Sequence, residues 1–133
     1  MVEAYSREKV HGTVDALPMK AGVSIGAGAA VSVDASGHAG VLQLGETFAG
    51  FAEMDASNAM GTGQLVTVET GNRYLLSVVG VVGPEDRGKD VYATGPNGFT
   101  LTEAGTGATK TPRVGKVAAH KAGTKAYILI EGV

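Results

Sequence analysis

Three residues with side chains common in catalysis, Asp34, Ser36 and His38, are spaced two apart along the chain. In an extended strand this spacing puts all three on one face, where they resemble the acid, nucleophile and base of a hydrolase. A working set also needs an enclosed base and an oxyanion hole, and the tip of a hairpin made of small residues does not easily supply them. We therefore interpret this cluster as a turn.

Two further matches to functional motifs lack their companion residues. The segment Gly26-Ala27-Gly28-Ala29-Ala30 begins like a dinucleotide-binding loop, but the third glycine is absent and a strand follows where a helix is needed. Ser6-Arg7-Glu8-Lys9 has the serine–lysine spacing of penicillin-binding enzymes without their other two motifs. We expect no cofactor and a protein that is not an enzyme.

The side chains that usually bind metals do not gather in the sequence. There is no cysteine, and the three histidines are scattered without a paired spacing. Acidic residues cluster at positions 53–55 and 85–90, but neither cluster has the pattern of a calcium loop. We expect no metal site.

The composition favours short strands and tight turns. The chain has 133 residues, of which 21 are glycine, 17 valine and 12 threonine. Apolar and polar residues alternate in most of the expected strands, and turn sequences separate them, including an Asn97-Gly98 pair that favours positive φ. We predict eight or nine strands in one all-β domain, a sandwich or barrel of short antiparallel strands with at most one or two helical turns. The strands are expected at 30–34, 65–69, 99–102 and 126–131, the turns at 34–37, 70–72, 95–98 and 122–124, and the helical turns at 53–60 and 84–87.

The segment Leu75–Val82 is almost continuously apolar, which predicts a strand buried on both faces, in a core or across a subunit contact. Gly80 is expected to mark a bend or bulge. A small domain with few aromatic residues has little volume to cover such a strand, so we expect the protein to self-associate. The residues proposed for this contact are Val78, Val79, Val81 and Val82.

Charge is distributed unevenly. Residues 1–66 have a net charge of −4 and residues 67–133 a net charge of +2. Arg113 and Lys116 belong to a basic C-terminal segment and are candidates for contact with an acidic partner. Because the aromatic residues that stack on nucleic-acid bases lie mostly elsewhere, we expect no nucleic-acid partner.

The longest apolar stretch has nine residues and no secretory signal is visible, so we expect a soluble intracellular protein with no membrane partner.

Residues 1–12 differ from the remainder in being charged and weakly patterned. We expect them to form an N-terminal arm that precedes a β-rich domain at 13–133. The arm offers Tyr5, Arg7 and Lys9 as candidates for contact with a partner.

The order of several segments resembles that of phage capsid cement proteins, also called head decoration proteins. The likeness covers residues 13–131 and is carried by 17–23, 26–37, 48–53, 66–71, 75–82, 88–94, 98–102, 114–117 and 126–130. The resemblance implies a small β-rich protein, often a homotrimer, that binds the outside of a mature icosahedral head and bridges major capsid subunits. It implies no catalytic residues, and it implies a location on the virion after assembly in the host cytoplasm.

A second hypothesis is a virion appendage domain that recognises a carbohydrate on the host surface. Sugar-binding platforms usually depend on aromatic faces, and this chain has no tryptophan and only 5% aromatic residues. The sequence therefore favours the capsid decoration protein.

Overall fold

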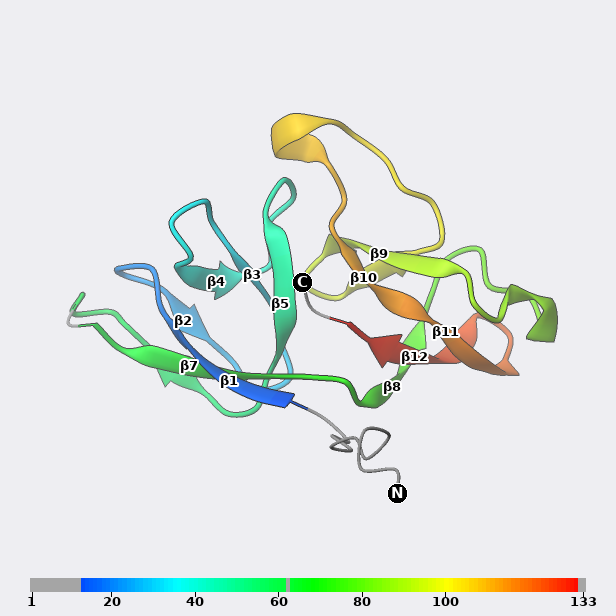
Figure 1. The fold of residues 1–133 in the computed structure, drawn as a ribbon, viewed down its shortest axis with the longest axis horizontal. Helices are drawn as coiled ribbons and strands as arrows, with labels where there is room; N and C mark the ends of the chain where they lie inside the picture. The colour runs from blue at the N-terminus through cyan, green and yellow to red at the C-terminus, as the bar shows by residue number, and fades with distance from the viewer. Residues whose placement is uncertain (1–12, 62, 132–133) are drawn as a thin grey trace, which may run out of the picture.

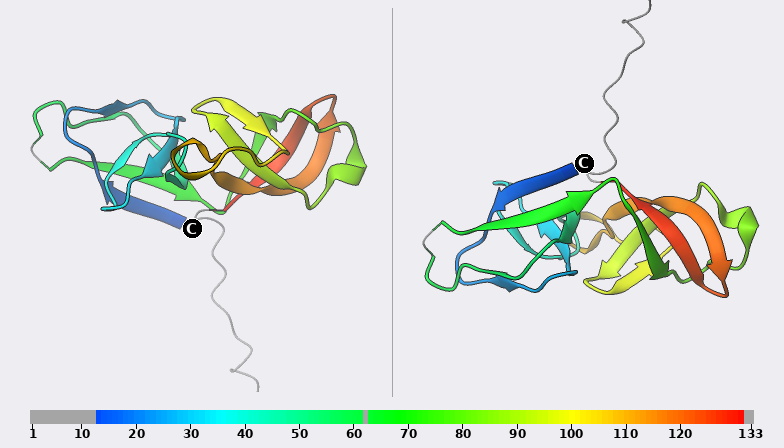
Figure 2. Two further views of the ribbon diagram at one scale, coloured as in Figure 1. Left: turned by 90° about the horizontal axis from the view of Figure 1, so that it is seen from above. Right: turned by 90° about the horizontal axis from the view of Figure 1, so that it is seen from below.

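The computed structural model describes residues 13–61 and 63–131 and shows the all-β protein that the sequence predicts (Figure 1). In this part of the chain, twelve strands are joined by turns and by two short 3-10 helices, η2 (Pro84–Asp86) and η3 (Gly107–Thr109). The strands form two five-stranded sheets and one two-stranded sheet. The two large sheets lie side by side along the long axis of the molecule (Figure 2).

The first large sheet has the strand order β1-β7-β5-β3-β4, and all its neighbouring pairs are antiparallel. It curls until its ends meet at a parallel bridge between Met19 and Ala39, where the Lys20 amide donates to Ala39 O at 2.9 Å. We call this unit, residues 13–70, the first barrel. Its strands are β1 (Thr13–Pro18), β3 (Ala30–Val33), β4 (Ala39–Val41), β5 (Thr47–Ala52) and β7 (Leu65–Thr70), and the small sheet consists of β2 (Ser24–Ile25) and β6 (Ala56–Ser57).

The second large sheet has the order β10-β9-β11-β12-β8 and is also antiparallel. It closes in the same way, through a parallel bridge between Val79 and Thr100. There the Val79 amide donates to Phe99 O at 2.9 Å and Val79 O accepts from the Leu101 amide at 3.0 Å. We call residues 71–131 the second barrel. Its strands are β8 (Arg73–Ser77), β9 (Asp90–Gly95), β10 (Gly98–Thr100), β11 (Arg113–Ala122) and β12 (Lys125–Ile130).

Strand β5 bends at Gly50. The strand is part of the wall of the first barrel and also contributes to the contact between the two barrels. Gly50 has a φ of 138°, where L side chains are strained, and a Cβ there would lie 2.7 Å from Glu69 O. The register between β3 and β5 shifts beside it, as at a β-bulge.

Two clusters of buried apolar side chains form the core. One lies within the first barrel and includes Ile25, Val66 and Val68. The other combines Phe48 and Phe51 of β5 with the interior of the second barrel. Because the second cluster contains residues of both large sheets, burial of apolar surface holds the two barrels together.

The segment Leu75–Val82 is not the strand buried on both faces that the sequence predicts. Strand β8 ends at Ser77, and Val79 and Val82 are 69% and 71% exposed. The chain leaves the β8–β12 ladder because Val79 must reach Thr100 to close the second barrel. Gly80, at a φ of 98°, forms the predicted bend.

The turns and helical turns follow the prediction in part. The turns at 34–37, 95–98 and 122–124 join hairpins as expected, whereas residues 71–72 lead from one barrel to the other. The expected positive φ at Asn97-Gly98 is absent. Helix η2 lies at the expected position near 84–87. The expected helical turn at 53–60 is wrong, because Ala56 and Ser57 pair with β2 as a strand.

Candidate functional site

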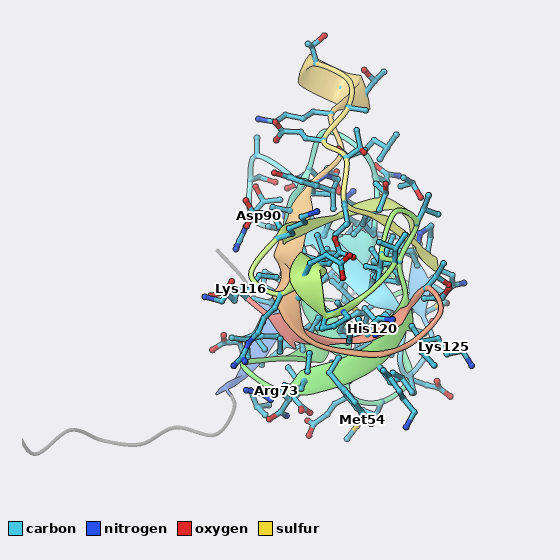
Figure 3. All side chains as sticks on the ribbon, turned by 90° about the vertical axis from the view of Figure 1, so that its right-hand side faces the viewer. Met54, Arg73, Asp90, Lys116, His120 and Lys125 are labelled. Atoms are coloured by element: carbon cyan, nitrogen blue, oxygen red, sulfur yellow. The ribbon has the colours of Figure 1, made fainter. Side chains whose placement is uncertain are left out.

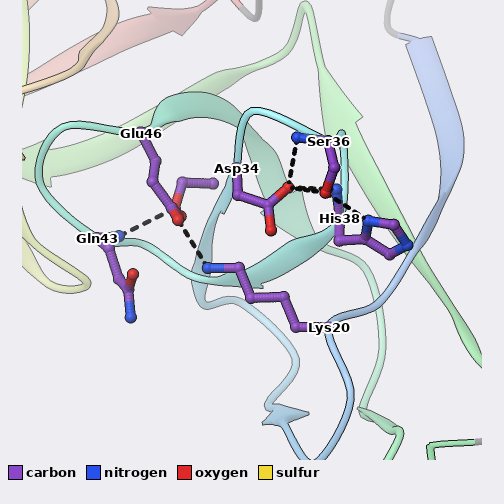
Figure 4. A network of polar contacts seen from close by, with 7 residues as sticks. Lys20, Asp34, Ser36, His38, Gln43 and Glu46 are labelled. Carbon is purple, nitrogen blue, oxygen red and sulfur yellow. Dashed lines mark hydrogen bonds and ion pairs between the residues drawn. The ribbon is translucent and has the colours of Figure 1, made fainter.

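The cluster that resembles a catalytic triad lies at the β3–β4 turn, where Ser36 bridges the other two side chains (Figure 4). Its hydroxyl donates to Asp34 Oδ1 at 2.7 Å and lies 2.9 Å from His38 Nδ1. A hydroxyl has one proton, so His38 Nδ1 must donate to Ser36 and is not a base for it. Asp34 Oδ1 also accepts from two backbone amides. The Ser36 hydroxyl, followed by the His38 N–H, lowers the pKa of Asp34. This geometry is that of a polar turn.

A second polar network fixes the loop between β4 and β5 (Figure 4). Ser32 is fully buried, donates to Glu46 Oε1 at 2.7 Å and accepts from the Gln43 amide at 2.9 Å. Lys20 Nζ donates to Glu46 Oε2 at 2.7 Å. Each charge in this network has a partner within the fold, so the network contributes to structure and leaves no free group for a ligand.

The four valines proposed as contact residues divide between the interior and the surface. Val78 and Val81 are 0% and 1% exposed and belong to the core, so these two cannot contact a partner in the folded protein. Val79 and Val82 stand out into solvent on the loop after β8. The structure therefore retains Val79 and Val82 as surface candidates.

The loop that carries Val82 is fixed by one buried carboxylate. Asp86 Oδ2 accepts from the Val82 amide at 2.7 Å and from the Gly83 amide at 3.2 Å, and Oδ1 accepts from Lys89 Nζ at 2.8 Å. The hydrogen bond from Lys89, then those from the two amides, lowers the pKa of Asp86 from 3.8 to about 2. The charged carboxylate thus holds the loop in place.

We expect Asp86→Asn to lower the melting temperature at pH 7 by several degrees. Because the folded protein has the lower pKa, the stabilisation by Asp86 is complete above about pH 4 and is lost as the pH falls through about 2. Thermal unfolding between pH 7 and pH 2 should therefore show a weaker acid dependence for Asp86→Asn than for the parent. Glu85→Gln, at an exposed neighbour, is the control, and equal curves for Asp86→Asn and the parent would contradict this role.

Arg113, one of the two basic candidates from the sequence, is held within the chain. Its Nε lies 2.9 Å from Asp90 Oδ1, and its Nη2 lies 2.9 Å from Glu131 Oε1. These contacts connect the end of β12 to β9 across β11. Arg113 therefore has a structural role, and its charge is largely compensated before any partner arrives.

Lys116, the other basic candidate, belongs to a group of four cationic side chains on the outside of the second barrel. Arg73 lies on β8, Lys116 and Lys121 on β11 and Lys125 on β12, and all four are exposed. None has an ion pair with an acidic residue of the described chain. Figure 3 shows Arg73, Lys116 and Lys125 on the surface of this barrel.

Apolar side chains occupy the space between these cations. Leu75 and Tyr127 are cross-strand partners and are 44% and 36% exposed. Half-buried Leu129 pairs with Arg73 on one side and with Lys116 on the other. Lys121 Nζ lies 5.7 Å from the centre of the Tyr127 ring. An apolar centre with a charged rim is the usual anatomy of a protein interface. We call this surface the basic face: Arg73, Leu75, Lys116, Lys121, Lys125, Tyr127 and Leu129.

The first barrel has the opposite charge. Residues 13–70 contain one lysine and six acidic residues, a net charge of −5, whereas residues 71–131 have eight basic and five acidic residues, a net charge of +3. Three exposed acids of the first barrel, Asp15, Glu53 and Asp55, have no ion pair with a basic residue of the described chain. Three apolar side chains of the same barrel are also exposed: Val14, Met54 and Leu65 are 53%, 61% and 52% exposed.

A cleft of about 270 Å³ lies where the loop 101–112 meets the first barrel. The Gly45 amide donates to Lys110 O at 2.7 Å, which attaches this loop to the turn before β5. The charged residues of the cleft, Glu46, Glu103, Lys110 and Arg113, are all in ion pairs. Its one aromatic residue, Phe48, is buried and offers no platform for a sugar.

No family model, curated protein or solved structure matches the chain. Within residues 13–61 and 63–131, no group of three or more histidine, cysteine or acidic residues could hold a metal ion. Over the same residues, no helix has the length and apolar character needed to cross a membrane. The proposed contacts Tyr5, Arg7 and Lys9 lie outside the described residues.

The sequence places Lys116, Lys121 and Lys125 in one basic C-terminal segment, of which Lys116 was the named contact candidate, but it gives no indication that Arg73 lies beside them. The signal for Lys125 was present, because Lys125, Tyr127 and Leu129 alternate with buried Ala126, Ile128 and Ile130 along one strand. Arg73 and Leu75 could not be assigned in the same way, since their place beside β12 depends on strand pairing.

Proposed function

We propose that this protein is a non-enzymatic phage capsid decoration protein. It binds the outer surface of the mature icosahedral head, bridges neighbouring major capsid subunits and acts as a homotrimer. The observation that carries the proposal is the order of the segments that resemble this family. Each of those segments contains at least part of a strand, and together they form most of the two barrels.

The surface of the molecule also supports the proposal. A decoration protein needs a body that remains rigid while it contacts several neighbours, and the shared core of the two barrels supplies such a body. Exposed Val79 and Val82 on the loop held by Asp86 offer apolar contacts to a capsid subunit. In the cleft beside the loop 101–112 the charged side chains are paired with one another, and the proposed role depends on contact through the surface.

A protein that binds the mature shell but not its precursor stabilises the mature shell by mass action, by about 2.7 kcal/mol per site at a free concentration 100 times the Kd. The test is incubation with expanded heads and with unexpanded shells of the phage whose genome encodes the chain, followed by sedimentation. We expect saturable co-sedimentation with expanded heads only, together with heads that withstand higher temperature. Absence of co-sedimentation would contradict the proposal, and specific binding to host glycans instead would favour the appendage domain.

Attachment to the head is expected to need the N-terminal arm. Ordering a charged segment on a surface costs roughly 1–2 kcal/mol of backbone entropy per residue, so its contacts must offset that cost. Deletion of residues 2–11 should leave the melting temperature and the oligomeric state nearly unchanged, because β1 begins at Thr13 and is paired with β7 along its whole length. Co-sedimentation with heads should become weaker. A truncated protein that misfolds, or that binds heads as well as the full chain, would show that this prediction is wrong.

A further inference from the structure

The two barrels follow one strand plan that occurs twice in the chain. In chain order the five strands of the first barrel are β1, β3, β4, β5 and β7, and those of the second are β8 to β12. In both barrels the neighbours around the wall are the first, fifth, fourth, second and third strands, in that order. In both, a parallel bridge joins the residues after the first strand to the third strand and closes the wall. Residues 71–131 therefore repeat the topology of residues 13–70.

Details of the backbone repeat as well. In the first barrel the amide of Gly28, at a φ of 83°, donates to Ala52 O at 2.8 Å. In the second barrel the amide of Gly88, at a φ of 87°, donates to Val117 O at 2.8 Å. The register between the second and fourth strands shifts in each barrel beside a glycine whose added Cβ would meet a backbone carbonyl of the fifth strand, and these glycines are Gly50 and Gly115. The two barrels are therefore two copies of one structural unit.

The repeat places the same end of this unit at opposite extremes of the molecule. In each barrel the loop after the first strand meets the start of the fifth strand: the Met19 amide donates to Gln64 O at 3.0 Å, and the Val78 amide donates to Thr124 O at 2.9 Å. In the first barrel this end lies at the left of the long axis in Figure 1, where the loop before β7 turns. In the second barrel it lies at the right, with helix η2, and both views in Figure 2 agree.

Each end presents one strongly exposed apolar side chain on a loop that a buried polar residue holds. Met60 is 85% exposed and Val82 is 71% exposed, the two highest values among the large apolar side chains of the described residues. Near Met60, Asn58 is 3% exposed, and its Nδ2 donates to Met19 O at 3.1 Å while its carbonyl accepts from the Gly61 amide at 2.9 Å. Near Val82, the carboxylate of Asp86 has the same role. A loop that is fixed before binding loses less entropy on contact.

We infer that one chain contacts two major capsid subunits, one at each end of its long axis, and that Met60 and Val82 are the apolar anchors of these contacts. The inference rests on the proposed function and names the surfaces that perform the bridging. The two barrels share a core cluster and form one rigid body, so the first contact brings the second anchor to its site at a high effective concentration.

The repeat also indicates the kind of partner. Two copies of one unit that face opposite directions suit two like sites on neighbouring molecules, and a shell of identical subunits provides such sites. Both ends project from the molecule in Figure 1, so the end of one copy cannot receive the end of another. The expected occupant is therefore a recess on the capsid subunit and not a second copy of this chain.

The first test measures binding of the full chain to expanded heads by co-sedimentation. Met60→Ser and Val82→Ser should each raise the apparent Kd at least about tenfold, because either change removes the gain from two linked contacts. The variant with both substitutions should bind more weakly than either single variant. Leu75→Ser, at an exposed leucine of β8 away from both ends, is the control and should bind like the parent. A parent-like Kd for either end variant would overturn the inference. Melting temperatures identify a variant that fails to fold, for which Met60→Gln or Val82→Thr gives the same comparison.

The second test identifies what each end contacts. The chain has no cysteine, so Met60→Cys and Val82→Cys place a thiol-attached photo-crosslinker at one end or at both. On expanded heads each single variant should yield one chain joined to one capsid subunit, and the double variant one chain joined to two. Joined pairs of this chain, or only one capsid subunit per double variant, would overturn the inference while head binding by the parent still supports the proposed function. A parent that does not sediment with heads would overturn both.

Discussion

We expect Gly115→Ala to lower the free energy of unfolding by about 3 kcal/mol, and the melting temperature by about 10 °C. Gly115 is buried on β11 at the point where its neighbours β9 and β12 both approach it, opposite Val91 and Ile130. A Cβ at this position would overlap the Leu129 carbonyl of β12, which is backbone and has no alternative rotamer. The β11–β12 ladder would have to separate locally, in the middle of the second barrel.

Gly95→Ala is the matched control for this prediction. Gly95 ends the neighbouring strand β9, its φ is not in the left-handed region, and a Cβ there would meet no atom within 4 Å. The same added methyl group should therefore leave the melting temperature within a few degrees of the parent value. Equal melting temperatures for Gly115→Ala and the parent, measured by circular dichroism, would contradict the close packing of β11 against β12.

The strand-forming parts of the fold were predictable because their signal is local. Alternation of apolar and polar residues identified β3, β7 and β12, and the reversal of the chain predicted at 122–124 is the turn between β11 and β12. Closure of each barrel was not predictable, since the bridges from Met19 to Ala39 and from Val79 to Thr100 join residues about 20 positions apart that have no distinguishing side chain. The apolar run Leu75–Val82 failed as one strand for this reason.

The candidate site shows the same division between local and long-range information. Sequence identified a basic C-terminal segment, but could not distinguish Arg113, which two carboxylates compensate, from Lys116, which remains free of described acidic partners. Only the pairing of β8 with β12 brings Arg73 and Leu75 beside Tyr127 and Leu129. The halves of the sequence already differed in sign of charge, and the fold assigns this difference to two separate barrels.

An aromatic cluster at the junction of the two barrels holds one barrel against the other. Phe51 comes from β5 of the first barrel and is 5% exposed. Its ring centre lies 4.7 Å from Tyr74 and 6.2 Å from Phe99, both of the second barrel, and 5.7 Å from Phe48 on its own strand. Tilted and edge-on aromatic pairs at these distances add to the stabilisation from burial.

Phe51→Ala should therefore lower the free energy of unfolding by about 3–5 kcal/mol, the range for removing a buried phenylalanine. The melting temperature should fall by more than about 10 °C, in a single transition, because the same core cluster contains residues of both barrels. Differential scanning calorimetry measures both effects.

Two further substitutions isolate the role of the junction. Phe51→Leu keeps most of the apolar volume and should cost less than about 1.5 kcal/mol. Tyr127→Ala removes an aromatic ring of similar size from the basic face, where it is 36% exposed, and should cause little loss of thermal stability. If Phe51→Ala instead melts in two separate steps, each barrel is stable without the other. The orientation of the two barrels would then have to be fixed by the loop 101–112, through the hydrogen bond from the Gly45 amide to Lys110 O.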